Sequence, residues 1–197
     1  HELRTPLNSI IGITKIVKED YQGSKENFEL IGVMQSASEA LLEIVNDILD
    51  LSKIEAGKIK LEHTDFDVKE VIQNVINTLQ TVSQRKSLYL KCEFLRDDVP
   101  VMVGDPLRIS RIFMNLLSNA VKYTEQGGVA VQVDFDELDD GRYLMKAKII
   151  DTGIGIDKQK IEQIFEKFTQ EDETTTRNFG GTGLGLTITR DLLSMMK

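Results

Sequence analysis

The stretch GDPLRISRIFMNLLSNAVKYT, residues 104–124, decides the second half of the fold. Asp105 is of a residue type that caps helix N-termini, because its carboxylate can accept a hydrogen bond from an exposed amide of the first turn. Pro106 suits the first helical position, since its ring fixes φ and that position needs no N–H donor. The sequence therefore predicts a helix that runs from about Pro106 to Tyr123.

Amphipathic helices and alternating strands surround this central helix. Apolar residues at helical spacing predict a helix over residues 68–82, and alternation predicts a strand over residues 88–94. Two further strands are expected at 129–135 and 143–150, joined by an acidic turn at 137–141. Mixed helices and half-buried strands predict an α/β domain in which helices cover one face of a mixed sheet.

The first 60 residues carry a different pattern, with an apolar position at every third or fourth residue. Residues 21–25, which include Gly23 and Ser24, interrupt the pattern, so it predicts two helices joined as a hairpin. The apolar residues of this heptad pattern are Leu3, Leu7, Ile10, Val17, Ile31, Met34, Leu41, Val45 and Ile48, and polar Thr14 and Ser38 occupy positions of the same series. A hairpin alone buries too little surface, so we expect two copies to form a dimeric four-helix bundle. Packing of the hairpin on the rest of its own chain is the alternative.

The heptad pattern stops within residues 51–67. There Gly57 is followed by residues 58–61, whose alternation predicts a turn into a short strand. We therefore place a domain boundary at this point, with residues 1–60 as a helical domain and residues 61–197 as the α/β domain.

Composition narrows the classes of partner. The 197 residues are 41% hydrophobic, enough for a packed core, and carry a formal net charge of −8. An acidic surface repels nucleic acid and anionic lipid, so neither is expected as a partner. A single cysteine, Cys92, excludes an internal disulfide, which fits the cytoplasm. No apolar run reaches 18 residues, so any membrane anchor is expected to lie outside this sequence.

Two glycine-bearing segments, DTGIGI at 151–156 and FGGTGLGL at 179–186, do not fit the common phosphate-binding motifs. A Walker loop needs Lys and then Ser or Thr after its glycines, whereas Gly185 is followed by Leu186 and Thr187. A dinucleotide fingerprint needs a strand directly before its glycines, whereas polar residues precede them here. Both motifs are therefore excluded.

The central helix offers another way to hold a nucleotide. Asn115 and Asn119 lie four residues apart on one face, where two amide oxygens can bind a hard cation that phosphates also ligate. Lys122 can pair with a phosphate, and Tyr123 offers a flat apolar wall to a base. A solvated asparagine pair on a helix surface is the alternative interpretation.

The two glycine segments complete this hypothesis. Asp151 ends a predicted strand, and the glycines after it let the backbone approach closely, so its carboxylate can accept a hydrogen bond from an exocyclic amine. The glycines of the second segment would let a loop fold over phosphates, with amides of the next helix offered to them. Ordinary turns at these glycines are the alternative. Asp157 is the natural cap of a further helix that we expect to begin at Lys158.

Five motifs of this sequence resemble, in the same order, the boxes that define sensor histidine kinases. HELRTPLN, residues 1–8, resembles their phosphoacceptor box, and NLLSNAVKYT, residues 115–124, resembles their N box. DTGIGI, FEKF and GGTGLGL resemble their G1, F and G2 boxes. The stretch FTQEDETTTRNFGGTGLGL is similar to hybrid members that also carry a receiver domain.

This resemblance implies a helical dimerisation and phosphotransfer domain followed by a Bergerat-type ATP-binding sandwich, the fold shared with gyrase and the heat-shock chaperone ATPases. It implies ATP and Mg²⁺ as ligands, with Asn119 first and Asn115 second as metal ligands. The nucleotide-binding residues that it implies are Asn115, Asn119, Lys122, Tyr123, Asp151, Gly153, Gly155, Arg177, Gly181, Thr182, Gly183, Leu184 and Gly185.

The resemblance implies that His1 is the phosphoacceptor, expected to be phosphorylated from ATP and to pass its phosphoryl group to a receiver aspartate of a response regulator. Glu2 can hold the second imidazole nitrogen and so fix the tautomer of a ring that titrates near neutral pH. In the family, an arrangement like that of Glu2 and Thr5 is associated with orienting a water that dephosphorylates the receiver. The other histidine, His63, is expected to be a surface residue of the linker.

This sequence departs from the family pattern at two points. Arg111 stands where the family commonly has glutamine, off the face of Asn115 and Asn119. The sequence ends at Lys197, where the family continues with further strands, so the ATP-binding domain is expected to be incomplete at its C-terminus.

The alternative function is a signalling scaffold that docks a receiver without catalysis. An ATPase that works mechanically is disfavoured, since it would leave His1 without a purpose.

Overall fold

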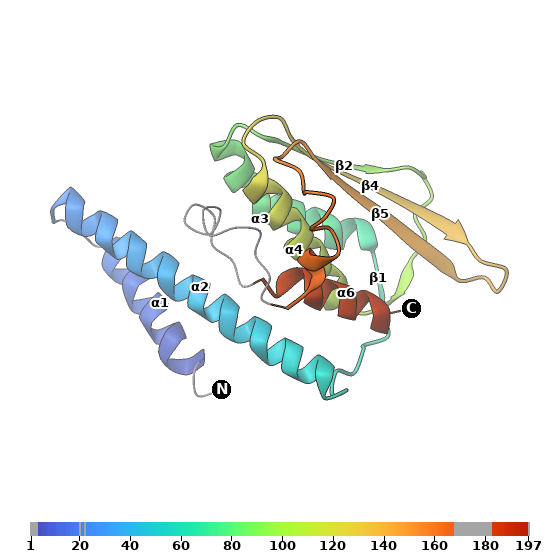
Figure 1. Cartoon of the computed structure of the whole chain (residues 1–197), viewed down its shortest axis with the longest axis horizontal. Coiled ribbons are helices and arrows are strands. Elements are labelled where there is room, and N and C mark those ends of the chain that lie inside the picture. Colours follow the sequence, from blue (N-terminus) through green and yellow to red (C-terminus); the bar gives the residue numbers. More distant parts are fainter. Residues whose placement is uncertain (1–3, 20, 22, 168–182, 197) are drawn as a thin grey trace. The chain divides into compact units, whose positions relative to one another are not determined.

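The computed structural model describes residues 4–19, 21, 23–167 and 183–196 (Figure 1). Its contacts divide the chain into two compact units, His1–Lys58 and Ile59–Lys197. Each unit has buried residues of its own.

The first unit is a hairpin of two helices, α1 (Arg4–Glu19) and α2 (Lys25–Glu55) (Figure 1). Ser24 caps the start of α2, where its hydroxyl accepts a hydrogen bond from an amide of the first turn at 3.4 Å. Buried Thr14 and Ser38 donate their hydroxyls to carbonyls of their own helices, which satisfies these polar groups inside the apolar series. The predicted helical hairpin is confirmed.

The prediction of a short strand at residues 58–61 is wrong, because these residues form no strand in the structure. The first strand, β1, forms later, at Thr64–Phe66. A strand needs a neighbour, and the antiparallel register of β3 (Met102–Gly104) reaches the three residues of β1 and no earlier ones. Upstream of β1, the Glu62 amide donates instead to the Asp105 carboxylate at 3.3 Å.

The second unit contains a three-stranded mixed sheet in the order β2-β4-β5 (Figure 1). β2 (Tyr89–Phe94) runs parallel to β4 (Gly128–Glu137), and β5 (Tyr143–Asp151) runs antiparallel to β4. The helices α3 (Val68–Arg85) and α4 (Pro106–Tyr123) pack on one face of this sheet. The predicted α/β fold is confirmed.

The core of this unit lies between β4 and the two helices. Alternate residues of β4 face inward, because successive side chains of a strand point to opposite faces. The main buried members are Val129, Val131, Val133 and Phe135 from β4, Ile72, Val75, Ile76 and Leu79 from α3, and Ile109, Phe113, Leu117 and Val121 from α4. The apolar face of α4 is thus used for packing, and its polar flank remains accessible.

The prediction of an α-helix that begins at Lys158 is wrong. Residues 158–162 form turns and lead into a single 3-10 turn, η1 (Gln163–Phe165). Asp157 does cap the first of these turns, since its Oδ1 accepts a hydrogen bond from the Gln159 amide at 2.9 Å. A segment this short makes too few i to i+4 hydrogen bonds to offset the cost of helix nucleation.

The last described helix, α6 (Gly185–Met195), packs on α4 and on η1. Its buried side includes Ile188 and Leu192, one helical turn apart. Fully buried Thr187 donates to the Phe165 carbonyl at 2.9 Å and so ties α6 to η1. None of the described helices is long and apolar enough to span a bilayer.

Candidate functional site

The helix α4 positions four of the predicted site residues. Its start is fixed by Asp105, which is 3% exposed and accepts hydrogen bonds from the Arg108 amide at 3.0 Å and the Glu62 amide at 3.3 Å. Its apolar face is buried in the core. The flank that stays partly exposed carries Asn115, Asn119, Lys122 and Tyr123.

Asn115 links α4 to the start of α6. The Asn115 Nδ2 donates to the hydroxyl of buried Thr189 at 2.8 Å. The Asn115 Oδ1 accepts a hydrogen bond from the Asn119 Nδ2 at 3.5 Å. Gly185 lies directly against this amide, since a Cβ built on Gly185 would come within 2.1 Å of the Asn115 Oδ1. The slot for the amide exists because residue 185 has no side chain. The structure thus brings Asn115, Asn119 and Gly185 together.

The other end of α4 contacts the segment that follows β5. The Tyr123 carbonyl accepts a hydrogen bond from the Ile154 amide at 3.3 Å. A Cβ on Gly153 would lie 2.6 Å from the same carbonyl oxygen, so a larger residue would push the two segments apart. Asp151 ends β5, and its Oδ1 accepts a hydrogen bond from the Gly153 amide at 2.9 Å. The residue is solvent-exposed, so its other carboxylate oxygen can meet a donor of a ligand.

The remaining described site residues differ in what they offer. The Lys122 ammonium lies 4.8 Å from the centroid of the Tyr123 ring, so both side chains share this end of α4. Gly155 and Gly183 have left-handed φ values of +73° and +67°, which residues with a side chain rarely adopt. Leu184 is 1% exposed, so its side chain belongs to the core and only its backbone can meet a ligand.

Several predicted site residues fall where the structure gives no side-chain description. His1, Glu2, Arg177, Gly181 and Thr182 lie outside the described residues. Thr5 lies in the first turn of α1, where the backbone alone is described. The roles assigned to these six residues therefore stay predictions.

Sequence reasoning missed two hydroxyl groups that hold the site together. One is Thr189, which bonds Asn115 across to α6. The other is Thr152, whose Oγ1 donates to the Gln126 carbonyl at 2.7 Å. This hydrogen bond links the Asp151 segment, residues 151–154, to the turn before β4. No local signal marked Thr189, because α6 carries a second buried threonine, Thr187, and charged residues such as Arg190.

The asparagine pair fits a cation site of the type that nucleotide phosphates complete. Because the Asn119 nitrogen points to Asn115, its oxygen lies on the other side of the amide and can act as a ligand. Asn115 uses its oxygen as an acceptor for that nitrogen, which favours Asn119 as the direct ligand. Mg²⁺ takes oxygen ligands and usually keeps waters and phosphates in its shell. Within the described residues, no cluster of three or more His, Cys, Asp or Glu side chains could hold a metal ion.

A cavity of about 490 Å³ lies apart from this flank of α4. It is lined by residues at the start of α3 and the end of β2, including Asp67, Lys69, Cys92 and Phe94. Burial raises the pKa of the Cys92 thiol. The cavity shares no residue with the predicted nucleotide site, so the two are separate features of the α/β unit.

Two family models match the chain. One, described as the His Kinase A (phospho-acceptor) domain, matches residues 1–57. The other, described as Histidine kinase-, DNA gyrase B-, and HSP90-like ATPase, matches residues 104–197. The first falls within the helical unit and the second within the α/β unit.

Curated relatives match the whole chain and extend well beyond it. The chain is 37% identical over 196 residues to the sensor histidine kinase GacS of Pseudomonas protegens, and 40% identical over 197 residues to the signal transduction histidine-protein kinase BarA of Escherichia coli. Each alignment covers 100% of this chain and 21% of the relative, so the chain spans about a fifth of their length. Among solved structures, full-length ShkA in complex with AMPPNP matches 98% of this chain and 39% of its own, with a TM-score of 0.76 and 28% identity.

The fold and the site together define a class of proteins in which a helical hairpin precedes an ATPase-type α/β sandwich. The chain belongs to the sensor histidine kinases, the family to which both models and these relatives point. The family predicted from the five motifs is confirmed.

Proposed function

We propose that this chain is the kinase core of a dimeric sensor histidine kinase, which uses ATP and Mg²⁺ to phosphorylate His1 and then passes the phosphoryl group to a receiver aspartate. The observation that carries the proposal is the contact of α4 with both glycine segments. At one end Asn115 meets Gly185, and at the other Tyr123 meets Ile154. Groups from three separate segments thereby converge along one flank of α4.

The flank of α4 would hold the nucleotide through contacts of different kinds. The Asp151 carboxylate would accept a hydrogen bond from the exocyclic amine of adenine, and the Tyr123 ring would lie against the base. Lys122 would pair with phosphate oxygens, while Asn119, supported by Asn115, would ligate Mg²⁺. When bound, the metal supplies positive charge that neutralises the phosphates during transfer.

His1 would act as the nucleophile. A neutral imidazole nitrogen attacks the γ-phosphorus, a nitrogen–phosphorus bond forms as the bond to the bridging β-phosphate oxygen breaks, and ADP leaves. Glu2 would hold the other ring nitrogen, fix the tautomer and stabilise the imidazolium that forms. Transfer to a receiver aspartate then breaks the nitrogen–phosphorus bond and restores the neutral histidine.

A response regulator is the proposed partner. A structurally similar protein, ThkA, has been solved in complex with the response regulator TrrA, and it matches this fold with a TM-score of 0.64 and 22% identity. The autoinducer 2 sensor kinase/phosphatase LuxQ of Vibrio vulnificus is 36% identical over 201 residues, which cover 100% of this chain and 23% of LuxQ. By analogy with that relative, Glu2 and Thr5 would orient a water that hydrolyses the phosphoaspartate of the receiver, which breaks the acyl phosphate bond, restores the aspartate and releases inorganic phosphate.

A homodimer through the helical hairpin is part of the proposal. Many large apolar side chains of the hairpin are exposed, and a second copy would cover them. They are Ile10, Ile13, Ile16, Val17, Phe28, Leu30, Val33, Met34, Leu41, Ile44 and Ile48. The proposed location is the cytoplasm, with any membrane attachment made by other segments.

A titration with Mg-ATP separates this proposal from a scaffold that docks a receiver without catalysis. The unmodified chain is expected to bind, and Asn119→Ala is expected to weaken binding by about 10- to 100-fold, since a contact to a charged group contributes about 1.5–3 kcal/mol. Asn74→Ala, on the exposed face of α3, is the matched control and should bind within about twofold of the unmodified chain. A folded, unmodified chain that binds no Mg-ATP would favour the scaffold.

A further inference from the structure

The side chain of Lys86, which lies outside α4, caps the C-terminal end of that helix. Its Nζ donates to three carbonyls, those of Val121 at 2.8 Å, Lys122 at 2.9 Å and Thr124 at 3.3 Å. The remaining carbonyl of this run, that of Tyr123, accepts a hydrogen bond from the Ile154 amide at 3.3 Å. All four carbonyls of residues 121–124 therefore have a partner from another segment.

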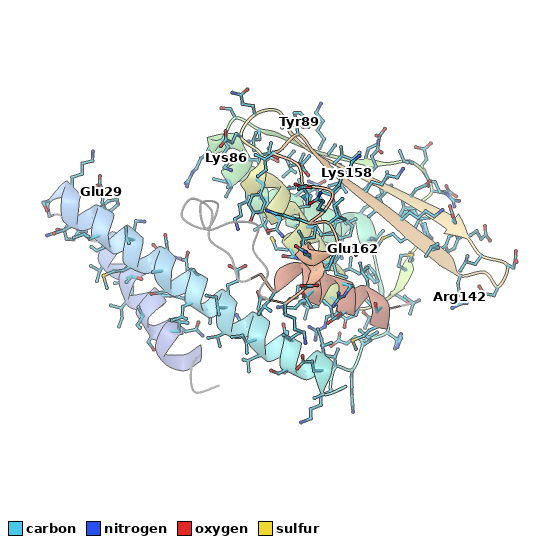
Figure 2. All side chains as sticks on the ribbon, in the orientation of Figure 1. Glu29, Lys86, Tyr89, Arg142, Lys158 and Glu162 are labelled. Carbon is cyan, nitrogen blue, oxygen red and sulfur yellow. The ribbon has the colours of Figure 1, made fainter. Side chains whose placement is uncertain are left out.

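This arrangement answers a general need of helix ends. The last carbonyls of a helix have no partner within it and form the negative end of its dipole. A lysine ammonium supplies both a positive charge and three donors. Lys86 is partly buried and is the C-cap residue of α3. It lies near the end of the sheet where Tyr89 begins β2, and far from Arg142 at the opposite end (Figure 2). One side chain thus joins the C-terminal ends of α3 and α4.

The backbone next to Lys86 forms a tight turn. Ser87 has a φ of +57°, a left-handed conformation that favours glycine. The Leu88 amide donates to the Ser83 carbonyl at 2.9 Å and closes the turn before β2. The chain reverses here while the Lys86 side chain reaches the end of α4.

We propose that Lys86 is a positioning residue of the nucleotide site. It holds the last turn of α4, which carries Lys122 and Tyr123, against the backbone of Gly153–Ile154. Without the ammonium, three carbonyls lose their donor, the turn frays, and the hydrogen bond between Tyr123 and Ile154 opens. Lys122 and Tyr123 are then no longer held beside the Asp151 segment. This inference rests on the proposed function, because it concerns the same site.

Two substitutions of lysine isolate this role. Lys86→Met removes the donors and the charge while keeping most of the side-chain stem. Lys69→Met is the matched control, because the Lys69 ammonium also donates to a carbonyl, that of Asp97 at 3.4 Å, beyond the far end of β2. The two readouts are hydrogen exchange of the Ile154 amide in the nucleotide-free chain and the Kd for Mg-ATP, measured below the melting temperature of each variant.

In Lys86→Met, the Ile154 amide is expected to exchange about tenfold faster and the Kd to rise about tenfold, whereas Lys69→Met should leave both within about twofold. A purely structural role would lower the melting temperature without changing the Kd of the folded chain. An unchanged Kd, or an unchanged exchange rate of the Ile154 amide, in folded Lys86→Met would overturn the inference. If Lys86→Met does not fold, Lys86→Gln, which keeps one amide group as donor, is judged by the same two readouts.

The two readouts also separate this inference from the proposed function. An unmodified chain that binds no Mg-ATP would refute the proposed function, whatever the exchange shows. Binding by the unmodified chain together with a normal Kd in Lys86→Met would refute the role of Lys86 alone.

Discussion

The Asn115 amide occupies a slot that exists because residue 185 is glycine. Thr189 holds the amide nitrogen, and Gly185 lies against the amide oxygen. At this scale the asparagine pair was predictable, since residues four apart share a helical face. Thr189 was not, because it lies 74 residues from Asn115 along the chain and nothing local marks the contact.

Gly185→Ala is expected to weaken Mg-ATP binding. The added carbon would lie 2.1 Å from the Asn115 Oδ1, so the amide must give up its hydrogen bond to Thr189. We expect the Kd, measured by calorimetric titration, to rise about tenfold, or about 1.4 kcal/mol. Gly12→Ala is the control, because a Cβ on Gly12 in α1 meets nothing within 4 Å. Normal binding by a folded Gly185→Ala variant would show that the slot does not matter.

Cys92 is expected to react slowly with thiol reagents. Burial raises the pKa of its thiol above the ordinary value of 9.0, so the folded chain holds less thiolate at mildly alkaline pH. The folded chain keeps this proton to a higher pH than the unfolded chain. The stability that the thiol contributes is therefore present below the ordinary pKa and is lost as the pH rises through the raised one. Rates with Ellman's reagent across alkaline pH, in buffer and in urea, measure the difference, and equal rates would contradict the prediction.

At the scale of elements, α4 shows which features of the fold are local. Asp105 and Pro106 mark its start, and the observed helix has the predicted bounds. The strand β1 was predicted at the wrong residues because its place depends on pairing with β3, far along the chain. The C-terminal end of α4 likewise depends on Lys86, a residue of another helix end that no local pattern connects to it.

Asp105→Ala is expected to lower the free energy of unfolding by about 2 kcal/mol. The carboxylate is almost fully buried and accepts hydrogen bonds from the Arg108 amide in α4 and the Glu62 amide before β1. The substitution removes the helix cap and leaves the Glu62 amide without its acceptor. Urea unfolding at neutral pH measures the loss. Asp105→Asn keeps an acceptor oxygen and should lose less, whereas no loss in Asp105→Ala would mean that water replaces both bonds.

At the scale of the whole molecule, the two compact units differ in how well each covers its apolar surface. The α/β unit has a buried core between β4, α3 and α4, although it also exposes apolar side chains such as Val103 and Ile156. The hairpin leaves large apolar side chains exposed along both helices, including Ile13, Val33 and Leu41. The order of motifs predicted the two-part fold, because each motif is a local pattern. The contacts of His1 were beyond sequence reasoning, and His1 lies outside the described residues.

Leu41→Glu is expected to convert the proposed dimer into a monomer. Leu41 is 50% exposed on α2 and belongs to the predicted heptad series, so a second copy would bury it. A carboxylate buried there without a partner would destabilise the interface strongly. Size-exclusion chromatography with light scattering measures the mass. Glu43→Gln, at an exposed position of α2, is the control and should stay dimeric, whereas a dimeric Leu41→Glu would place the interface elsewhere.

Labelling with ATP that carries a labelled γ-phosphate is the most direct test of the proposed activity. The chain contains two histidines, His1 and His63, so each can be replaced alone. With Mg²⁺ present, the unmodified chain and His63→Gln are expected to acquire label that is acid-labile and alkali-stable, whereas His1→Gln should acquire none. Equal label in His1→Gln, or no label on a chain that binds Mg-ATP, would contradict the assignment of His1 as the phosphoacceptor.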